Sequence, residues 1–233
     1  MCIRDRRLGY VHKGIDRLMR GASLARGAEL AARTSGDSTV GYSWAFAQAV
    51  EAALCVAVPE RAFRLRGLMA EVERLANHLG DIGAICNDAA FALLHAHFGA
   101  LRERTLRAAD IAFGHRLMRD RIVPGGVATE LNLDGVAAIS AVIAEVGTSL
   151  PPLVETYDNT ASLQDRTVST GVLKPALVAK YGAGGYIGRA SGRSFDTRRT
   201  LPYAPYGELT FEVPVLSEGD VDARVWIRIR EVE

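Results

Sequence analysis

Titratable and amide side chains interrupt an apolar helical pattern between positions 74 and 88. Asn77 and His78 are neighbours, Asp81 follows about one helical turn later, and Asp88 closes the stretch. Burying such groups costs free energy unless each finds a polar partner. The stretch is therefore either a network that fixes a turn between two helices or a functional site. In both cases we expect the helix to end and the chain to reverse direction before Asp88. A buried or half-buried Asp88 would then approach His78 and Asn77 at one end of a bundle.

A second pair of titratable residues lies near the N-terminus. His12 and Asp16 are four positions apart, which places both on one face of a helix. Because an imidazole titrates near neutral pH, such a pair can relay a proton. It can equally be a solvated pair without a further role. Both interpretations stay open at this point.

The elements that must position these residues are predicted to be long amphipathic helices. One apolar stripe runs from Leu65 to Ile82 and another from Phe91 to Phe113, both at intervals of three and four residues. Pro59 suits the first position of the former helix. We expect the latter helix to span about 89–121 and to end at Pro124-Gly125-Gly126. Further helices are predicted at 9–32 with breaks near Gly21 and Gly27, at 38–56, and at 134–146 (capped by Asp134), with a shorter one to 158 after Pro151-Pro152.

The C-terminal part has a different composition. After Thr167 glycines and prolines become frequent, and the apolar stretches 209–213 and 225–229 are typical of strands. The predicted fold class is mostly α, a helical bundle of long helices with a small α+β C-terminal part. We predict one domain over 1–233, a fragment of a larger subunit, with the bundle in 1–166 and a Gly- and Pro-rich tail in 167–233.

Composition narrows the class of protein. The 28 Lys and Arg residues balance 27 Asp and Glu residues, which predicts no nucleic-acid partner. No apolar run approaches the roughly 18 residues of a membrane span, and the basic N-terminus lacks the apolar core of a signal peptide. Three widely spaced cysteines match no metal-ligand spacing and no disulfide scaffold. A thiol-reducing, cytoplasmic setting follows.

Seven short motifs follow one another in a fixed order along the chain. They are Gly9–Asp16 (GYVHKGID), Ala47–Glu51 (AQAVE), Arg74–Leu79 (RLANHL), Pro124–Val127 (PGGV), Asp165–Val168 (DRTV), Ala190–Gly192 (ASG) and Asp196–Tyr203 (DTRRTLPY). Together they resemble the superfamily of the nickel–iron hydrogenase large subunit and its relative, the D-type, quinone-site subunit of NADH–quinone oxidoreductase (respiratory complex I). The stretch from Asn77 to Gly83 is most similar to the energy-converting hydrogenases and their metal-free relatives.

The resemblance implies an oxidoreductase subunit that is active only within a complex. Its partners would be a B-like iron–sulfur subunit, a C-like subunit and the membrane arm. The complex would lie at the cytoplasmic side of a bacterial or archaeal inner membrane, with this subunit peripheral. A quinone would be the acceptor, and NADH and iron–sulfur clusters would be bound by partner subunits.

The resemblance also implies roles for particular residues. Asp88 matches the family's aspartate that supports the quinone-headgroup histidine, and Asp16 takes the position of a proton-transfer carboxylate. With His78 they form the predicted catalytic set, because quinone reduction needs acid or imidazole groups in a dry pocket. His12 and Asn77 are predicted to contact the cofactor.

One departure from the family pattern concerns metal. Hydrogenases of this family carry a Cys-Gly-x-Cys motif whose thiolates bind the metal centre, and this chain has Ser35 and Ser38 at those positions. A hydroxyl with a high pKa does not replace a soft thiolate ligand. We therefore expect no metal site and no nickel. Gly36 also stands at or beside the position of the family's quinone-contacting Tyr.

Two alternative functions remain. One is a hydrogenase large subunit of the formate hydrogenlyase type, and the other is a redox-inactive scaffold of such a complex.

Overall fold

A computed structural model of the chain describes residues 12–233. This part consists of helices and one small hairpin, so the mostly α prediction is confirmed. The N-terminal elements are α1 (Ile15–Met19), α2 (Leu24–Ala31), the 3-10 helix η1 (Gly36–Ser38) and α3 (Thr39–Leu54). The central elements are α4 (Glu60–Asp88), α5 (Ala92–Phe113), strands β1 (Ile122–Val123) and β2 (Gly126–Val127), and α6 (Leu133–Asn159). The C-terminal elements are α7 (Ala161–Thr167), α8 (Pro175–Tyr181), α9 (Gly185–Ala190), α10 (Thr197–Thr200), η2 (Tyr206–Glu208) and α11 (Val221–Val232).

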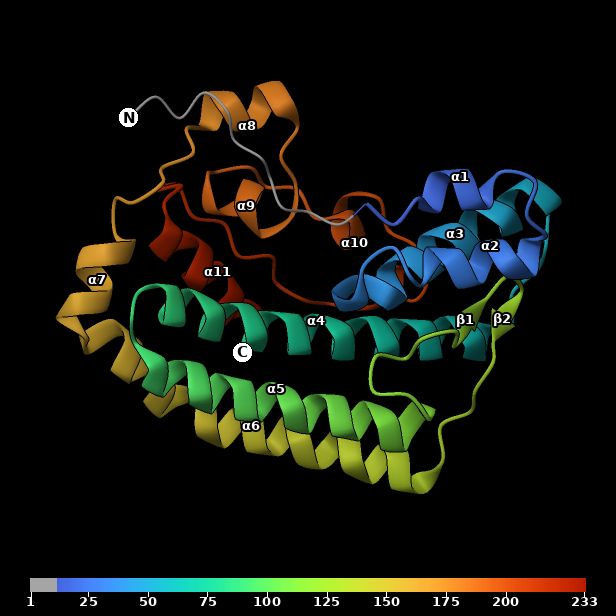
Figure 1. Cartoon of the computed structure of the whole chain (residues 1–233), viewed down its shortest axis with the longest axis horizontal. Coiled ribbons are helices and arrows are strands. Elements are labelled where there is room, and N and C mark those ends of the chain that lie inside the picture. Colours follow the sequence, from blue (N-terminus) through green and yellow to red (C-terminus); the bar gives the residue numbers. More distant parts are fainter. Residues whose placement is uncertain (1–11) are drawn as a thin grey trace.

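Helix α4 is the central element of the molecule. Figure 1 shows α4 across the middle, with α5 and α6 on one side and the N- and C-terminal helices on the other. The two predicted stripes pack on each other, since Leu79 and Ile82 lie in one core cluster with Phe98, and Leu65 lies in a second with Phe113. Burial of both stripes stabilises the pair far more than intrinsic helix propensity does. The predicted α4–α5 packing is confirmed.

Helix α6 packs against α5. A Cβ at Gly135 would lie 2.7 Å from the Cα of Ala112, so glycine permits the close approach. The predicted break at Pro151-Pro152 is wrong, because α6 continues to Asn159 while Leu150 stays in the core. The helix begins earlier than expected because the Asn132 side chain, rather than Asp134, accepts the N–H of Gly135.

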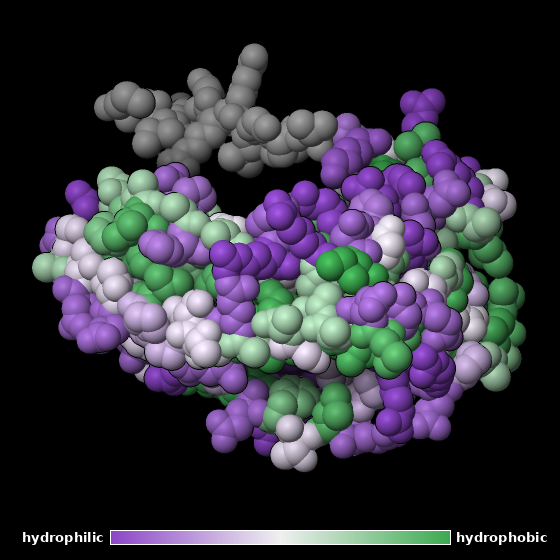
Figure 2. All heavy atoms as spheres, turned by 90° about the horizontal axis from the view of Figure 1, so that it is seen from below, coloured by the Kyte–Doolittle hydropathy of each residue, from purple (hydrophilic) through white to green (hydrophobic). Residues whose placement is uncertain are grey.

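The expectation about membrane spans needs a correction at α6. Within residues 12–233 this helix alone has the length and composition to cross a membrane, with a mean hydropathy of 1.5 over 18 residues and 22% of that window buried. One face of α6 nevertheless packs on α5 as in a bundle, and Arg104 of α5 pairs with Glu145. Figure 2 views the molecule from below, where green apolar side chains are mixed with purple hydrophilic ones.

The N-terminal helices are shorter than predicted. A break at Gly21, whose φ is +72°, separates α1 from α2 as expected, whereas Gly27 lies inside α2 against Phe46. Positions 9–11 of the predicted helix, and of the first motif, lie outside the described residues. His12 precedes α1, which begins at Ile15, so the predicted helical face shared by His12 and Asp16 does not form.

The structure also differs from the predicted elements after α5 and in the C-terminal tail. Helix α5 ends at Phe113, and Pro124-Gly125 forms the turn of a hairpin in which Ile122 pairs with Val127. The stretch 209–213 has no partner strand among the described residues, and 225–229 lies inside α11. Asp220 caps α11 by accepting the N–H of Ala223, so the prediction of strands was wrong. The single-domain assignment stays a prediction, with which the packing of α11 on α4 is compatible.

Candidate functional site

A cleft of about 630 Å³ lies between α3, α4 and the C-terminal segments. Its floor is the face of α4 that carries Arg74, Asn77, His78 and Asp81, as the helical spacing predicted. The opposite wall comes from residues far along the chain, because Tyr186, Thr197, Tyr203, Tyr206 and Arg228 also line it. The polar stretch of the sequence therefore faces a cavity rather than only a helix turn.

Aromatic side chains form one wall of the cleft. Trp44 lies edge-on to Tyr203, with ring centroids 5.1 Å apart, and is stacked with Tyr206 at 6.1 Å. Trp44 is only 4% exposed, and its indole N–H has no hydrogen-bond partner within residues 12–233. A buried donor without a partner is costly. This wall is thus made of packed aromatic rings, and the indole N–H of Trp44 is buried behind it.

His78 is held between two charged residues of α11. Its Nδ1 lies 3.1 Å from Nη1 of Arg228, and its Nε2 lies 2.7 Å from Oε2 of Glu231. Because a guanidinium only donates, Nδ1 must accept, which leaves the proton on Nε2, facing the carboxylate. Burial lowers the pKa of His78, and Arg228 and Arg74 lower it further, against the opposing effect of Glu231. The ring is therefore neutral at neutral pH.

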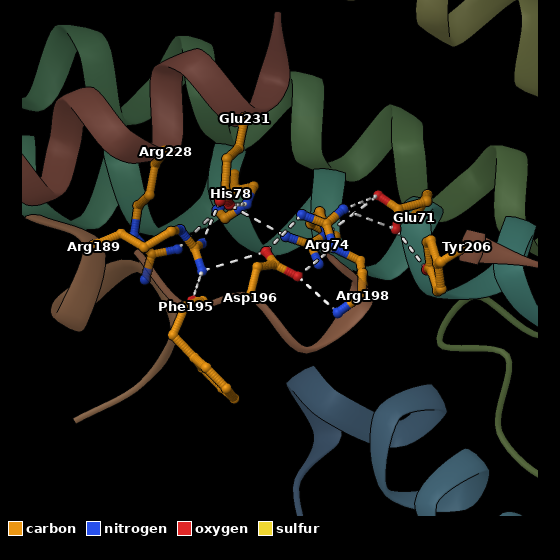
Figure 3. A network of polar contacts seen from close by, with 10 residues as sticks. All are labelled: Glu71, Arg74, His78, Arg189, Phe195, Asp196, Arg198, Tyr206, Arg228 and Glu231. Carbon is orange, nitrogen blue, oxygen red and sulfur yellow. Dashed lines mark hydrogen bonds and ion pairs between the residues drawn. The ribbon is translucent and has the colours of Figure 1, made fainter. Parts of the chain in front are cut away.

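A chain of buried and half-buried ion pairs extends from His78 along α4 (Figure 3). Glu231 contacts Arg189 and lies 3.2 Å from Arg74. Burial alone would raise the pKa of Glu231, but His78 and the two guanidiniums hold it at about 2. The chain continues through Asp196, Arg198, Glu71 and the hydroxyl of Tyr206, the last donating to Glu71 over 2.6 Å.

Asp196 and Arg198, both from the last of the seven motifs, form an ion pair within this network. The two groups are 2.9 Å apart and both are buried. Arg198 lowers the pKa of Asp196 against the effect of burial, which by itself raises it. Each buried charge of the network has an opposite charge beside it, as burial requires. The network fixes α9, α10 and α11 on α4 and so positions the cleft wall.

Glu73 is a titratable residue of the cleft that the sequence reasoning missed. Its carboxylate accepts the backbone N–H of Val40 over 2.6 Å and that of Gly41 over 3.0 Å, both in the first turn of α3. Burial raises its pKa to about 7, these two hydrogen bonds oppose the rise, and Asp37 adds to it. Glu73 precedes Asn77 by one helical turn, and this spacing could have placed Glu73 on the same face of the predicted helix as the other site residues.

Asn77 lies in the cleft as predicted, beside η1. Its amide donates to the carbonyl oxygen of Asp37 over 2.5 Å, and Asp37 pairs with Arg102 at 3.3 Å. The contact ties α4 to the turn that precedes α3. Ser38 also lines the cleft, so the position that carries a cysteine ligand in hydrogenases faces the same cavity here.

The other predicted site residues lie apart from the cleft. Asp88 is exposed at the C-terminal end of α4, so its predicted burial is wrong. His78 and Asp88 share one continuous helix, and ten residues correspond to about 15 Å along its axis, which also makes their predicted approach wrong. Asp16 is exposed on α1, and exposed His12 accepts the N–H of Gly14 over 3.1 Å.

The side chains near Ser35 and Ser38 do not fit the metal centre of the hydrogenases. Across 12–233, no group of three or more His, Cys, Asp and Glu side chains has the arrangement of a metal site. Cys55 is exposed, and burial raises the pKa of the Cys86 thiol to about 11, which disfavours the thiolate that a soft metal needs. Two hydroxyls in place of thiolates leave no soft donor pair at this position.

Comparison with known proteins gives one consistent family. The family described as "Respiratory-chain NADH dehydrogenase, 49 Kd subunit" matches residues 61–233. Formate hydrogenlyase subunit 5 of Escherichia coli K12 is 32% identical over 98% of the chain, and the NADH-quinone oxidoreductase D subunit of Dehalococcoides mccartyi is 30% identical over 96%. The carbon monoxide-induced hydrogenase of Rhodospirillum rubrum is 29% identical over 96%. The chain spans 40%, 61% and 62% of the lengths of these three relatives.

Proposed function

Because this chain belongs to the family of the respiratory-chain NADH dehydrogenase 49 Kd subunit, we propose that it helps to form the quinone-reduction site of a membrane-associated complex similar to NADH–quinone oxidoreductase. Its relatives make it a subunit of an oxidoreductase complex. The cleft beside α4 is the observation that supports the quinone assignment. Quinone reduction takes two electrons and two protons, so a site needs an aromatic surface for the ring and acid–base groups near the ring oxygens.

The cleft supplies these groups from the chain's own residues. Tyr203 and Trp44 form the aromatic wall that holds the ring. Asn77 and neutral His78 define the floor. Iron–sulfur clusters of a partner subunit supply electrons, and NADH binds to another partner. This chain therefore binds and orients the acceptor and provides protons.

Photolabelling of the full-length complex tests this proposal. A photoreactive benzoquinone analogue is expected to label Trp44 or Tyr203, and excess short-chain quinone is expected to prevent the labelling. Tyr181 serves as the comparison, because it is 73% exposed and lies outside the cleft-lining residues. Labelling that excess quinone does not reduce, or that favours Tyr181 over the cleft, contradicts the assignment.

The hydrogenase alternative predicts a different metal content. Two of the relatives above carry hydrogenase or formate hydrogenlyase names, which keeps this function as the second candidate. Because Ser35 and Ser38 replace the thiolate ligands, we expect no stoichiometric nickel in the purified full-length complex. Elemental analysis by mass spectrometry checks this. About one nickel per subunit would select the hydrogenase. An intact complex with neither nickel nor inhibition by quinone analogues would select the scaffold.

Asp88 is proposed to act on the exposed end of α4 rather than inside the cleft. The family resemblance gives Asp88 a role in supporting a quinone-site histidine, so the Asp88→Asn variant of the full-length complex is expected to reduce quinone at least tenfold more slowly, the lower part of the range for acid–base groups. Its melting temperature is expected to stay unchanged, because an exposed side chain on a helix end contributes little to stability. Unchanged turnover in a normally assembled complex removes Asp88 from the site. Asp16 stays proposed as a proton-transfer carboxylate and His12 as a cofactor contact, both on the family resemblance, and both are exposed.

The proposed partners follow from the same family. We place the chain beside a B-like iron–sulfur subunit, a C-like subunit and membrane-arm subunits, at the cytoplasmic side of the inner membrane. Exposed apolar side chains on α6 support the proposal that a partner subunit covers this surface, since Leu133 is 86% exposed and Ile143 is 57% exposed.

A further inference from the structure

Glu73 borders two cavities of the structure. It lines the large cleft, and it also lines a small cavity of about 10 Å³ together with Asp37, Asn77 and Arg102. A volume of this size holds about one water molecule. The Asp37 side chain at this cavity is 73% exposed and so reaches solvent. Glu73 therefore borders both the ligand space and a small cavity that solvent-exposed Asp37 also lines.

Glu73 also differs from the other carboxylates around the cleft. Asp81 pairs with Arg228 at 2.6 Å, Asp37 pairs with Arg102, and Glu231 contacts several cations. No Lys, Arg or His of the described chain lies within ion-pair distance of Glu73, whose carboxylate accepts from two backbone N–H groups instead. A partly buried carboxylate such as that of Glu73, without a counter-ion, binds a proton more readily than a paired one.

The charged groups around Glu73 act in opposite directions. Asp37 of η1 faces it and favours the protonated form, as does burial, while the N–H groups of α3 favour the carboxylate. Arg74, His78 and Asp81 share its face of α4, Arg102 and Arg116 line the small cavity, and Arg228 lies across the cleft. The pKa of about 7 means that both forms are populated at neutral pH. A group in this state can both release and take up a proton.

We propose that Glu73 exchanges protons between solvent at Asp37 and the molecule bound in the cleft. This inference rests on the proposed function, because it names the proton donor of that acceptor site. The O–H bond of protonated Glu73 breaks as an O–H bond forms on the acceptor oxygen. The carboxylate then takes a proton from water through the small cavity. The acceptor gains two electrons from iron–sulfur carriers of the partner subunit, and two such proton transfers balance the charge.

The test compares three variants in the full-length complex. Glu73→Gln removes the titrating group while it keeps an oxygen that accepts the N–H of Val40 or Gly41. Glu73→Asp keeps a carboxyl group on a shorter side chain. Glu60→Gln is the matched control, because Glu60 lies on the same helix but its side chain is 75% exposed and lies outside the cleft.

Infrared difference spectroscopy over a pH series is the first readout. We expect a protonated-carboxyl band that titrates near pH 7, that is absent in Glu73→Gln and that remains in Glu60→Gln. The second readout is the pH profile of short-chain benzoquinone reduction. Glu73→Gln is expected to lower turnover at least tenfold, and Glu73→Asp to restore part of it with a shifted profile.

Two results overturn the proposal. One is a band that persists in Glu73→Gln or that titrates only in the ordinary carboxyl range. The other is unchanged turnover in an assembled Glu73→Gln complex. If the unaltered complex reduces no quinone, the proposed function fails, and the infrared titration by itself decides whether Glu73 exchanges protons near neutral pH. If Glu73→Gln does not assemble, the shifted or unshifted pH profile of Glu73→Asp decides.

Discussion

The Arg66→Ala variant is expected to lose about 3–5 kcal/mol of unfolding free energy, because it leaves a buried carboxylate without its cation. Arg66 is fully buried and contacts Glu51 over 2.5 Å. The same guanidinium donates to the carbonyl oxygens of Val123 and Gly126 in the β1–β2 hairpin. One substitution therefore removes the contacts of α4 with Glu51 of α3 and with the hairpin, while the Glu51 carboxylate keeps only the N–H of Gly125 within the described chain. Urea-induced unfolding followed by tryptophan fluorescence measures the loss.

The matched control is Arg61→Ala on the same helix. Arg61 pairs with Glu130, but both side chains are largely exposed, at 65% and 68%. Exposed ion pairs contribute little because solvent screens them. We expect no clear change in the unfolding midpoint for this variant. Equal losses of unfolding free energy for Arg61→Ala and Arg66→Ala would show that burial of the Arg66–Glu51 pair is not what stabilises the contact between α3, α4 and the hairpin.

Glu231→Gln is expected to change how stability depends on pH. The pKa of this carboxyl is about 4.5 in the unfolded chain and about 2 in the folded protein. A lowered pKa stabilises the folded state above pH 4.5, and this stabilisation is lost as the pH falls towards 2. The difference corresponds to about 3 kcal/mol, at 1.36 kcal/mol per pKa unit. Glu231→Gln should lack this part of the acid destabilisation.

The variant should also be less stable than the unaltered chain at pH 7, because Arg189 and Arg74 lose a partner. The measurement is chemical unfolding of both proteins at several pH values between 2 and 7. Glu155→Gln, at an exposed position of α6, controls for the loss of one carboxylate. Parallel curves for Glu231→Gln and the unaltered chain would contradict the role given to this residue.

Helical periodicity predicted the central packing because both partners of that contact are local. The Leu65–Ile82 and Phe91–Phe113 stripes are long, regular and joined by a short turn, so their burial against each other follows from the pattern. The same periodicity placed Arg74, Asn77 and His78 on one face of α4. It gave no length limit for this helix, which continues to Asp88. That extension separates Asp88 from His78.

The opposite wall of the cleft was not predictable in the same way. The stretch 225–229 reads Val-Trp-Ile-Arg-Ile, and its β-branched and aromatic side chains favour strands, which produced the wrong assignment. In the structure Val225 and Ile229 enter one core cluster and Ile227 another, so α11 is buried on two sides. Once the segment is a helix, Arg228 and Glu231 are three residues apart and face α4 together. Tertiary packing, which one sequence does not reveal, decided this element.

The contact between His78 and Arg228 joins residues 150 positions apart. By contrast, α4 and α5 are neighbours in the chain and need only a short loop to meet. Long loops close late in folding because their conformational entropy must be lost before any contact compensates for it. We therefore expect the α4–α5 hairpin to assemble early and the cleft to appear only when α11 docks at the end. A chain arrested before that step would be largely helical and still unable to hold an acceptor, so ligand binding marks the completion of folding.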